Sequence, residues 1–207
     1  MASSFYESFD NGTGALTHKW AGNIDTSVSG QITLRGQSGV MERPSGNDAG
    51  HGYGQYTVTA KVEGNQVGPA ALLWPSDDKW PGTELDFVEV LRDGTAYGTA
   101  HHGNNGYDWY EAEMYWNLDE SQVHTYGINW QADHVTFSVD GRDVGTVWMD
   151  TKDAAHGGSN VVFGVMGGLV QSILEDRERR GLSGLGEGIT AHVEAPSAEV
   201  LSGMELP

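Results

Sequence analysis

The nine residues 82–90, "GTELDFVEV", place three carboxylates in a segment that otherwise has the composition of a buried strand. Successive side chains of a strand point to opposite faces, so Glu84 and Asp86 share a face, whereas Glu89 should point to the other one. One extra residue at Phe87–Val88, a β-bulge, would reset this alternation and return Glu89 to the face of the other two acids. We therefore predict a bulge here and three carboxylates on one surface.

Carboxylates this close together cannot all ionise freely, so we expect the pKa of at least one of them to be raised. Hydrolysis of a glycosidic bond requires an ionised and a protonated carboxyl group beside each other. An exposed acidic strand or a calcium site would have the same spacing. The residues alone leave catalysis, calcium binding and a solvated surface open.

The rest of the chain predicts an all-β fold that could hold such a strand. Strand patterns occur at 56–62, 70–74, 123–130, 135–139, 144–149, 160–166 and 190–194, and Asp140-Gly141 is a strong hairpin turn. Residues 171–187 are charged and rich in glycine, which favours a solvated or partly disordered segment over a short helix at Ser172–Arg180. Many short strands with glycine-rich turns predict a β-sandwich jelly roll of two antiparallel sheets, with a concave substrate cleft, as one domain over 1–207.

The composition restricts the class of ligand. The chain has 207 residues, no cysteine and a formal net charge of -18. Nucleic acid and anionic membrane surfaces need a basic footprint, so both are disfavoured as partners, and no apolar segment is long enough to cross a membrane. We expect a monomer with a neutral ligand.

The first ten residues, "MASSFYESFD", lack the basic and apolar regions of a signal peptide. We expect a secreted or extracellular protein whose signal has been removed or whose export does not follow the Sec route. The absence of cysteine excludes a disulfide framework and leaves the redox state of the compartment open.

Several motifs resemble one family. "WPGTELDFVE" is similar to the active-site strand of the family-sixteen glycoside hydrolases, in the longer form that is typical of the laminarinase-like branch. The segments 71–74, "ALLW", 98–101, "GTAH", and 123–141, "VHTYGINWQADHVTFSVDG", resemble further strands of that family. The resemblance covers residues 53–170, and 171–207 is atypical because it lacks the strand with which the family usually closes.

The resemblance implies a role for each acid. Glu84 matches the nucleophile, Asp86 the assisting carboxylate and Glu89 the general acid/base of a double displacement that retains the anomeric configuration. No cofactor is implied. A structural calcium ion on the convex face is common in the family; its ligands remain unknown here, although Glu7 and Asp10 lie near the usual N-terminal region.

A sugar ring offers an apolar face and a rim of hydroxyl groups, so its site should combine flat aromatic and short polar side chains. The segment 101–117, "HHGNNGYDWYEAEMYWN", is dense in both and was expected to form a loop. The predicted substrate-binding residues are Trp74, Trp80, His101, Asn104, Trp109 and Trp116.

The leading interpretation is a retaining endo-acting hydrolase of β-1,3 or mixed β-1,3-1,4 glucan, with a polysaccharide as its partner. Similar bacterial proteins also cut exopolysaccharides such as succinoglycan, which is the nearest alternative. A non-catalytic carbohydrate-binding jelly roll would not need all three acids. A structural surface protein would leave the aromatic segment unexplained.

Overall fold

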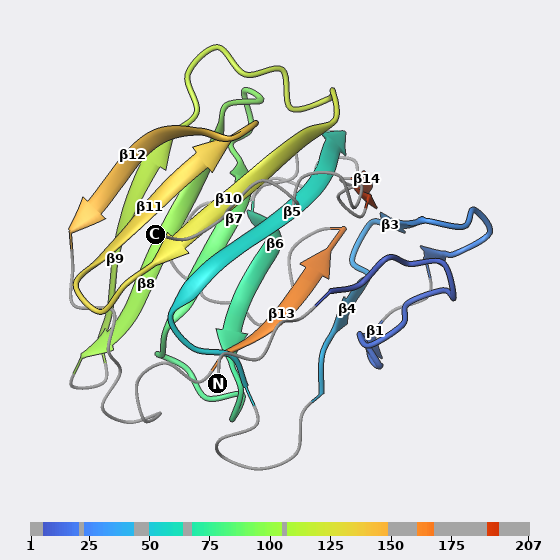
Figure 1. Cartoon of the computed structure of the whole chain (residues 1–207), viewed down its shortest axis with the longest axis horizontal. Coiled ribbons are helices and arrows are strands. Elements are labelled where there is room, and N and C mark those ends of the chain that lie inside the picture. Colours follow the sequence, from blue (N-terminus) through green and yellow to red (C-terminus); the bar gives the residue numbers. More distant parts are fainter. Residues whose placement is uncertain are drawn as a thin grey trace, which may run out of the picture.

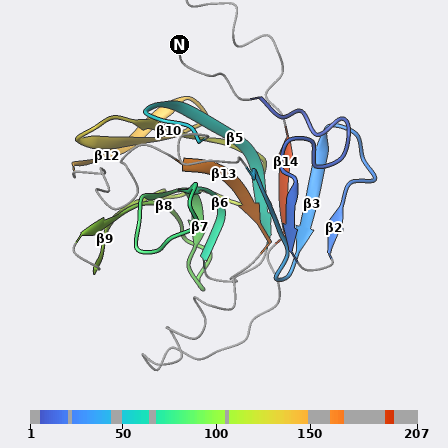
Figure 2. The ribbon, with the colours of Figure 1, turned by 90° about the horizontal axis from the view of Figure 1, so that it is seen from below.

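Two antiparallel sheets of seven strands each make up the described part of the chain, and they lie as two layers (Figures 1 and 2). The computed structural model describes residues 6–20, 23–43, 50–63, 68–104, 107–148, 161–167 and 190–194. The predicted all-β sandwich is confirmed. No helix among these residues has the length and apolar character needed to cross a membrane.

The first sheet, here called sheet A, carries the acidic strand near its middle. Its order is β1 (His18–Trp20), β4 (Gly39–Met41), β13 (Val161–Met166), β6 (Gly68–Pro75), β7 (Glu84–Val90), β8 (Ala96–Asn104) and β9 (Tyr107–Met114). The second, sheet B, has the order β12 (Arg142–Trp148), β11 (His134–Val139), β10 (His124–Trp130), β5 (Gly54–Glu63), β14 (Thr190–Glu194), β3 (Gln31–Arg35) and β2 (Ile24–Asp25).

The hydrophobic core lies between the sheets and follows the alternation of the strands. In β11, Val135, Phe137 and Val139 are buried, whereas the intervening side chains are half-buried. The β11–β12 hairpin turns at Asp140 and Gly141, with φ angles of 51° and 74°. Two residues with positive φ give a turn whose twist matches that of the flanking strands, so the predicted hairpin is confirmed.

The expected loop at 101–117 is wrong, because most of this segment belongs to strands β8 and β9. These two strands pair from Tyr97–Met114 to Asn104–Tyr107. β9 is the edge strand of sheet A, and its first six residues are exposed on both faces. Polar and aromatic side chains therefore occupy both faces of the strand, and the apolar alternation that would reveal a strand is missing.

The C-terminal predictions are tested only at 190–194. The predicted strand there is confirmed as β14, which pairs with both β3 and β5. The favoured solvated or partly disordered segment at 171–187 and the alternative helix at Ser172–Arg180 lie outside the described residues. The single domain over 1–207 stays a prediction.

The predicted bulge in β7 is confirmed by the pairing with β8. Asp86 lies opposite Thr99 and Glu89 opposite Tyr97. Phe87 and Val88 therefore both lie opposite one residue, Gly98. The extra residue changes the parity of the strand between Asp86 and Glu89.

Candidate active site

The three carboxylates of β7 lie on the face of sheet A that is turned away from sheet B. Glu84, Asp86 and Glu89 are 5%, 1% and 6% exposed. The apolar residues Leu85 and Phe87 point instead into the core between the sheets. Burial of three acids on one strand is unusual, because charged side chains are rarely buried without a functional or paired environment.

Glu89 is held by two hydroxyl groups from β8. Tyr97 donates to Oε2 of Glu89 at 3.1 Å, and the Thr99 hydroxyl donates to Oε1. Tyr97, Thr99 and His101 alternate along β8 and so share one face. These contacts place Glu89 on the same face as the other two acids, as the bulge predicts.

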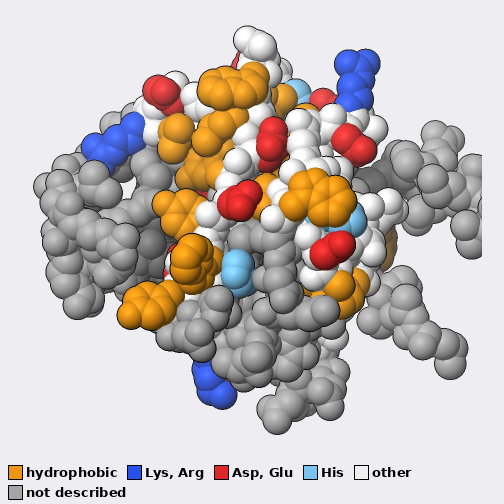
Figure 3. All heavy atoms as spheres, turned by 90° about the vertical axis from the view of Figure 1, so that its left-hand side faces the viewer, with side chains coloured by type: hydrophobic (Ala, Val, Ile, Leu, Met, Phe, Trp, Pro, Cys, Tyr) orange, Lys and Arg blue, Asp and Glu red, His pale blue; other side chains and the backbone are white. Residues whose placement is uncertain are grey.

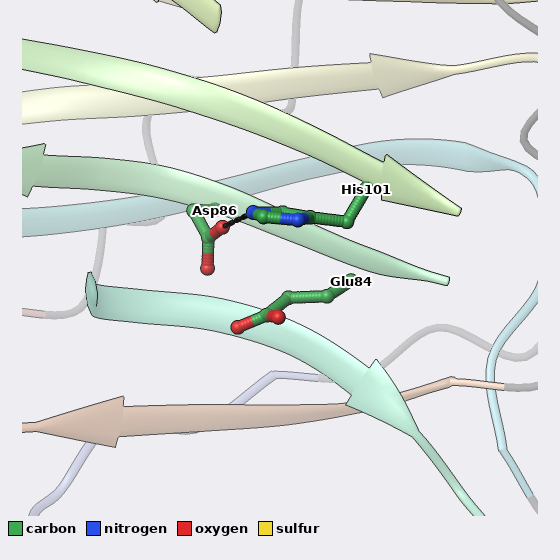
Figure 4. A group of neighbouring side chains, drawn as sticks. All are labelled: Glu84, Asp86 and His101. Carbon is green, nitrogen blue, oxygen red and sulfur yellow. Dashed lines mark ion pairs between the residues drawn. The ribbon is translucent and has the colours of Figure 1, made fainter. Parts of the chain in front are cut away.

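His101 joins Asp86 to a fourth carboxylate. Its Nε2 lies 3.5 Å from Oδ2 of Asp86, and its Nδ1 lies 3.1 Å from Oδ1 of Asp108 on β9. Figure 4 shows the imidazole pointing to Asp86, with Glu84 beside the pair. Ligand atoms of Glu84, Asp86 and His101 all lie within 4.8 Å of one another, a spacing that could also hold a metal ion.

Burial and neighbouring charges change the pKa values of the acids in this site. The pKa of Glu84 is raised to about 7, mainly by burial; the charge of His101 opposes this rise and the charge of Glu89 adds to it. Burial, followed by the charges of Glu84 and Glu89, raises the pKa of Asp86 well above its usual range. Asp86 therefore keeps its proton to higher pH than an exposed aspartate does, and the expectation of a raised carboxyl pKa is confirmed.

For His101, burial and the neighbouring charges act on the pKa in opposite directions. Burial by itself would lower the pKa of His101, but the hydrogen bond that its Nδ1 donates to Asp108 and the charges of Glu84, Asp108 and Glu89 together raise it. A protonated imidazole beside Glu84 favours the carboxylate form of that residue. The result is a series of charges in which the exposed Asp108 supports the positive charge of His101, and His101 supports the negative charge of the buried Glu84.

Four rings form a row across the strands at this end of the site. Trp74 and Trp80 stack with centroids 5.2 Å apart and planes inclined by 9°. Trp80 meets His101 edge-on at 5.5 Å, and His101 lies 5.3 Å from Tyr110. Asp78 fixes Trp74 by accepting its indole hydrogen bond at 2.8 Å. The row runs from β6 to β9, with Trp80 43% exposed.

The structure does not bring the other predicted ligand residues into this row. Trp109 lies opposite His102 in the β8–β9 pairing, so it is on the opposite face from Tyr110 and His101. Trp116 is 74% exposed and lines a hollow with the turn at 93–95. Asn104 ends β8 opposite Tyr107. Figure 3, seen from the side of β9 and β12, shows hydrophobic and acidic side chains interspersed on this surface.

Sequence reasoning missed the groups that contact the predicted residues. Tyr97 and Thr99 could have been found by counting back from His101 in steps of two. Asp108 and Tyr110 could not, because their position depends on the register of the β8–β9 hairpin.

The suggested calcium ligands are already engaged with the chain. The two carboxylate oxygens of Glu7 accept the backbone N–H groups of Phe9 and Ala15 at 2.8 and 2.7 Å. Asp10 accepts the hydroxyl of Ser29 at 3.0 Å. These contacts give Glu7 and Asp10 a structural role of their own, and the calcium ion stays a prediction.

The described part of the chain is thus an all-β sandwich with three buried acids on one strand and a row of four rings beside them. The family model "Glycosyl hydrolases family 16" matches residues 15–172. This match covers more than half of the chain, and the chain belongs to that family. The family-sixteen resemblance is therefore confirmed.

Curated relatives and solved structures agree with this assignment. A xylanase/beta-glucanase of Ruminococcus flavefaciens is 37% identical over 71 residues, which are 34% of this chain and 9% of that protein. A beta-glucanase of Acetivibrio thermocellus is 33% identical over 105 residues, covering 45% of this chain and 28% of that protein. The chain thus spans less than a third of either relative. The Bacillus licheniformis beta-glucanase structure has a TM-score of 0.62 at 21% identity, covering 94% and 96% of the two chains, and shares the fold.

Proposed function

We propose that this chain is a retaining, endo-acting hydrolase of β-1,3 or mixed β-1,3-1,4 glucan. The observation that carries the proposal is the cluster of Glu84, Asp86 and Glu89, three buried acids on one face of one strand. A binding protein has no use for two carboxyl groups with raised pKa values, whereas hydrolysis of a glycosidic bond depends on acids in different protonation states.

In the first step, Glu84 attacks the anomeric carbon while Glu89 donates a proton to the departing glycosidic oxygen. The bond from the anomeric carbon to the leaving sugar breaks, and an ester to Glu84 forms. The protonated Asp86 and the cationic His101 next to Glu84 favour its ionised form, which is the form that attacks.

In the second step, Glu89 has lost its proton and serves as the general base. It removes a proton from water as the water attacks the anomeric carbon from the side that the leaving sugar vacated. The ester bond breaks, and Glu84 is regenerated as a carboxylate. Two inversions at the same carbon give net retention. The Tyr97 and Thr99 hydroxyl groups keep the carboxyl group of Glu89 in place through both steps.

The row of rings supports a glycan that crosses the strands. Trp80 and Tyr110 are 43% and 64% exposed and lie on either side of His101. Sugar faces pack against such rings, so subsites extend from β6 towards β9, beyond the acids. Binding along an internal stretch of a polysaccharide favours endo action. The bulge, which resembles that of the laminarinase-like branch, supports acceptance of β-1,3 linkages.

The test is a panel of polysaccharides: β-1,3 glucan, mixed-linkage glucan, cellulose, a galactan and a succinoglycan-type exopolysaccharide. We expect reducing ends from the first two, with a rapid fall in viscosity that marks internal cleavage. If the exopolysaccharide alone is cleaved, it replaces β-glucan as the substrate. If none of the polymers is cleaved, the proposal is wrong.

Glu84→Gln is the matched variant for this panel. It keeps the shape of the side chain and removes the attacking charge. We expect its turnover to fall by several orders of magnitude, while glucan binding measured by affinity electrophoresis persists. Near-normal turnover would remove Glu84 from the reaction.

A further inference from the structure

The bulge of β7 is contacted from behind, on the core side of the sheet. The hydroxyl of Tyr115, just after the end of β9, donates a hydrogen bond of 2.7 Å to the backbone carbonyl of Phe87. Phe87 is one of the two residues that face Gly98 in the irregular pairing of β7 with β8. The bulged carbonyl thus has a side-chain donor at the point where the ladder changes register.

Gly98 provides the space for this contact. A Cβ atom at position 98 would overlap the Tyr115 hydroxyl and the ring of Phe137. The residue opposite the bulge is therefore one without a side chain, and the hydroxyl occupies the room that remains. Bulge, glycine and tyrosine fit together as one unit.

The surroundings keep this hydroxyl neutral and fixed. Tyr115 is 3% exposed, and burial raises the pKa of its hydroxyl well above the ordinary value. A buried neutral hydroxyl that donates to a buried carbonyl satisfies both groups, and losing either partner leaves the other without compensation. The ring stacks on Tyr126, with centroids 6.0 Å apart.

We propose that Tyr115 is a positioning residue that fixes the β7 bulge through the Phe87 carbonyl and thereby sets the place of Glu89 relative to Glu84. This inference rests on the proposed function and adds a residue to its machinery. Glu89 lies two residues after Phe87, and Val88 between them is buried. A shift of the bulge would move Glu89 relative to the hydroxyl groups of Tyr97 and Thr99. The proton that Glu89 gives to the leaving oxygen would then be misplaced.

Tyr126 supplies a matched control. Its hydroxyl is buried and has no hydrogen-bond partner among the described residues, and its ring packs on that of Tyr115. Tyr115→Phe and Tyr126→Phe each remove one buried hydroxyl from neighbouring rings. Only Tyr115→Phe removes a bond to the bulge.

The experiment separates proton donation from attack by comparing two substrates. Hydrolysis of a β-glucan needs the acid, whereas a dinitrophenyl β-glucoside of a short glucan has a leaving group that needs no proton. We expect Tyr115→Phe to lower kcat on the glucan by roughly 10- to 100-fold with little change in KM. The rate constant for release of dinitrophenolate in the first turnover should fall by less than about 3-fold. Tyr126→Phe should match the wild type in both.

Equal losses on the two substrates would mean that Tyr115 supports the fold and not the place of Glu89, and no loss on either would remove its role. Thermal unfolding is measured for each variant. If Tyr115→Phe is unfolded at the assay temperature, it is compared with the wild type and Tyr126→Phe at a lower temperature at which all three are folded. A wild type that is inactive on every glucan overturns the proposed function, whereas an active wild type with equal losses in Tyr115→Phe overturns only this inference.

Discussion

The carboxylate of Asp108 lies 3.1 Å from Nδ1 of His101, while the opposite nitrogen of the same ring lies 3.5 Å from Asp86. The two acids come from β9 and β7, and the histidine comes from β8 between them. The edge strand of the sheet therefore contributes a charge to the cluster without reaching the reacting acids itself. Through this contact, the charge of Asp108 on β9 affects the protonation state of His101 on β8.

Asp108→Asn should shift the pH dependence of hydrolysis. Losing the Asp108 charge lowers the pKa of His101, and a neutral His101 no longer favours the carboxylate form of Glu84. The charge of Asp108 also raises the pKa of Glu84 directly, but this effect is smaller than that of His101. The net pKa of Glu84 therefore rises, and the acid limb of the kcat/KM profile should move to higher pH by less than about one unit.

Asp133→Asn is the control for this shift. It removes the same charge from beside another histidine, His134, at the surface, where Nδ1 and the carboxylate are 2.7 Å apart. Its profile should coincide with that of the wild type. An unshifted acid limb in Asp108→Asn would contradict the coupling between Asp108 and Glu84.

The stability of the fold should fall as pH rises through the range in which Glu84 ionises. The pKa of Glu84 is raised from 4.5 to about 7 in the folded chain, so folding takes up a proton between these values. The stabilisation is fully present below about 4.5 and is lost as the pH passes 7. Glu84→Gln removes this ionisation and should exceed the wild type in free energy of unfolding at pH 8, by a few kcal/mol at most.

Urea unfolding at pH 5 and pH 8 measures this difference. The two proteins should be closer in stability at pH 5 than at pH 8. A difference that does not change with pH would show that the charge of Glu84 costs the folded state nothing.

The stereochemistry of the first product should identify the double displacement. NMR of a reaction started with a β-glucan should show the β-anomer of the new reducing end before mutarotation produces the α-anomer. An initial α-anomer would mean a single inversion, with water in the place assigned to the ester of Glu84.

Trp80→Ala should weaken substrate binding. Trp80 is 43% exposed and stacks on Trp74, so it offers one face to a sugar ring. We expect KM to rise roughly 10-fold with kcat less affected. Trp148→Ala, on the exposed surface of β12, is the control and should leave both constants unchanged.

Trp109→Ala decides between the sequence-based expectation and the strand register. The pairing opposite His102 puts Trp109 on the face away from the acids, so we expect no change in KM. A rise as large as that of Trp80→Ala would restore Trp109 to the substrate site.

The acidic strand and its bulge could be predicted because both depend on local alternation. Glu84, Asp86 and Glu89 are close in sequence, and one extra residue decides which face the last of them occupies. The role of Asp108 depends instead on a pairing between strands that are not identifiable in isolation, since the edge strand is exposed on both faces. The face of Trp109 follows from the same register, and a shift of one residue would reverse it.

The hydrogen bond between Tyr115 and the bulge could not be predicted from the sequence, because it also depends on how distant segments pack. Tyr115 and Phe87 are 28 residues apart, and only the folded sheets bring the hydroxyl behind β7. Apolar and aromatic composition predicts that Tyr115 is buried but not which carbonyl it meets. Contacts of this kind require the three-dimensional packing.

The strand orders also bear on the sequence of events during synthesis of the chain. Among the described strands of both sheets, the N-terminal ones join the rest through late ones: β4 is linked to β6 by β13, and β3 to β5 by β14. Strands β1 to β4 leave the ribosome first but have no lateral partner in the main body until residues 161–166 and 190–194 emerge. Such long-range pairing makes folding slow and leaves open strand edges exposed in the meantime. Strands β1 to β4 should therefore pair with the rest of their sheets only after β13 and β14 have been synthesised.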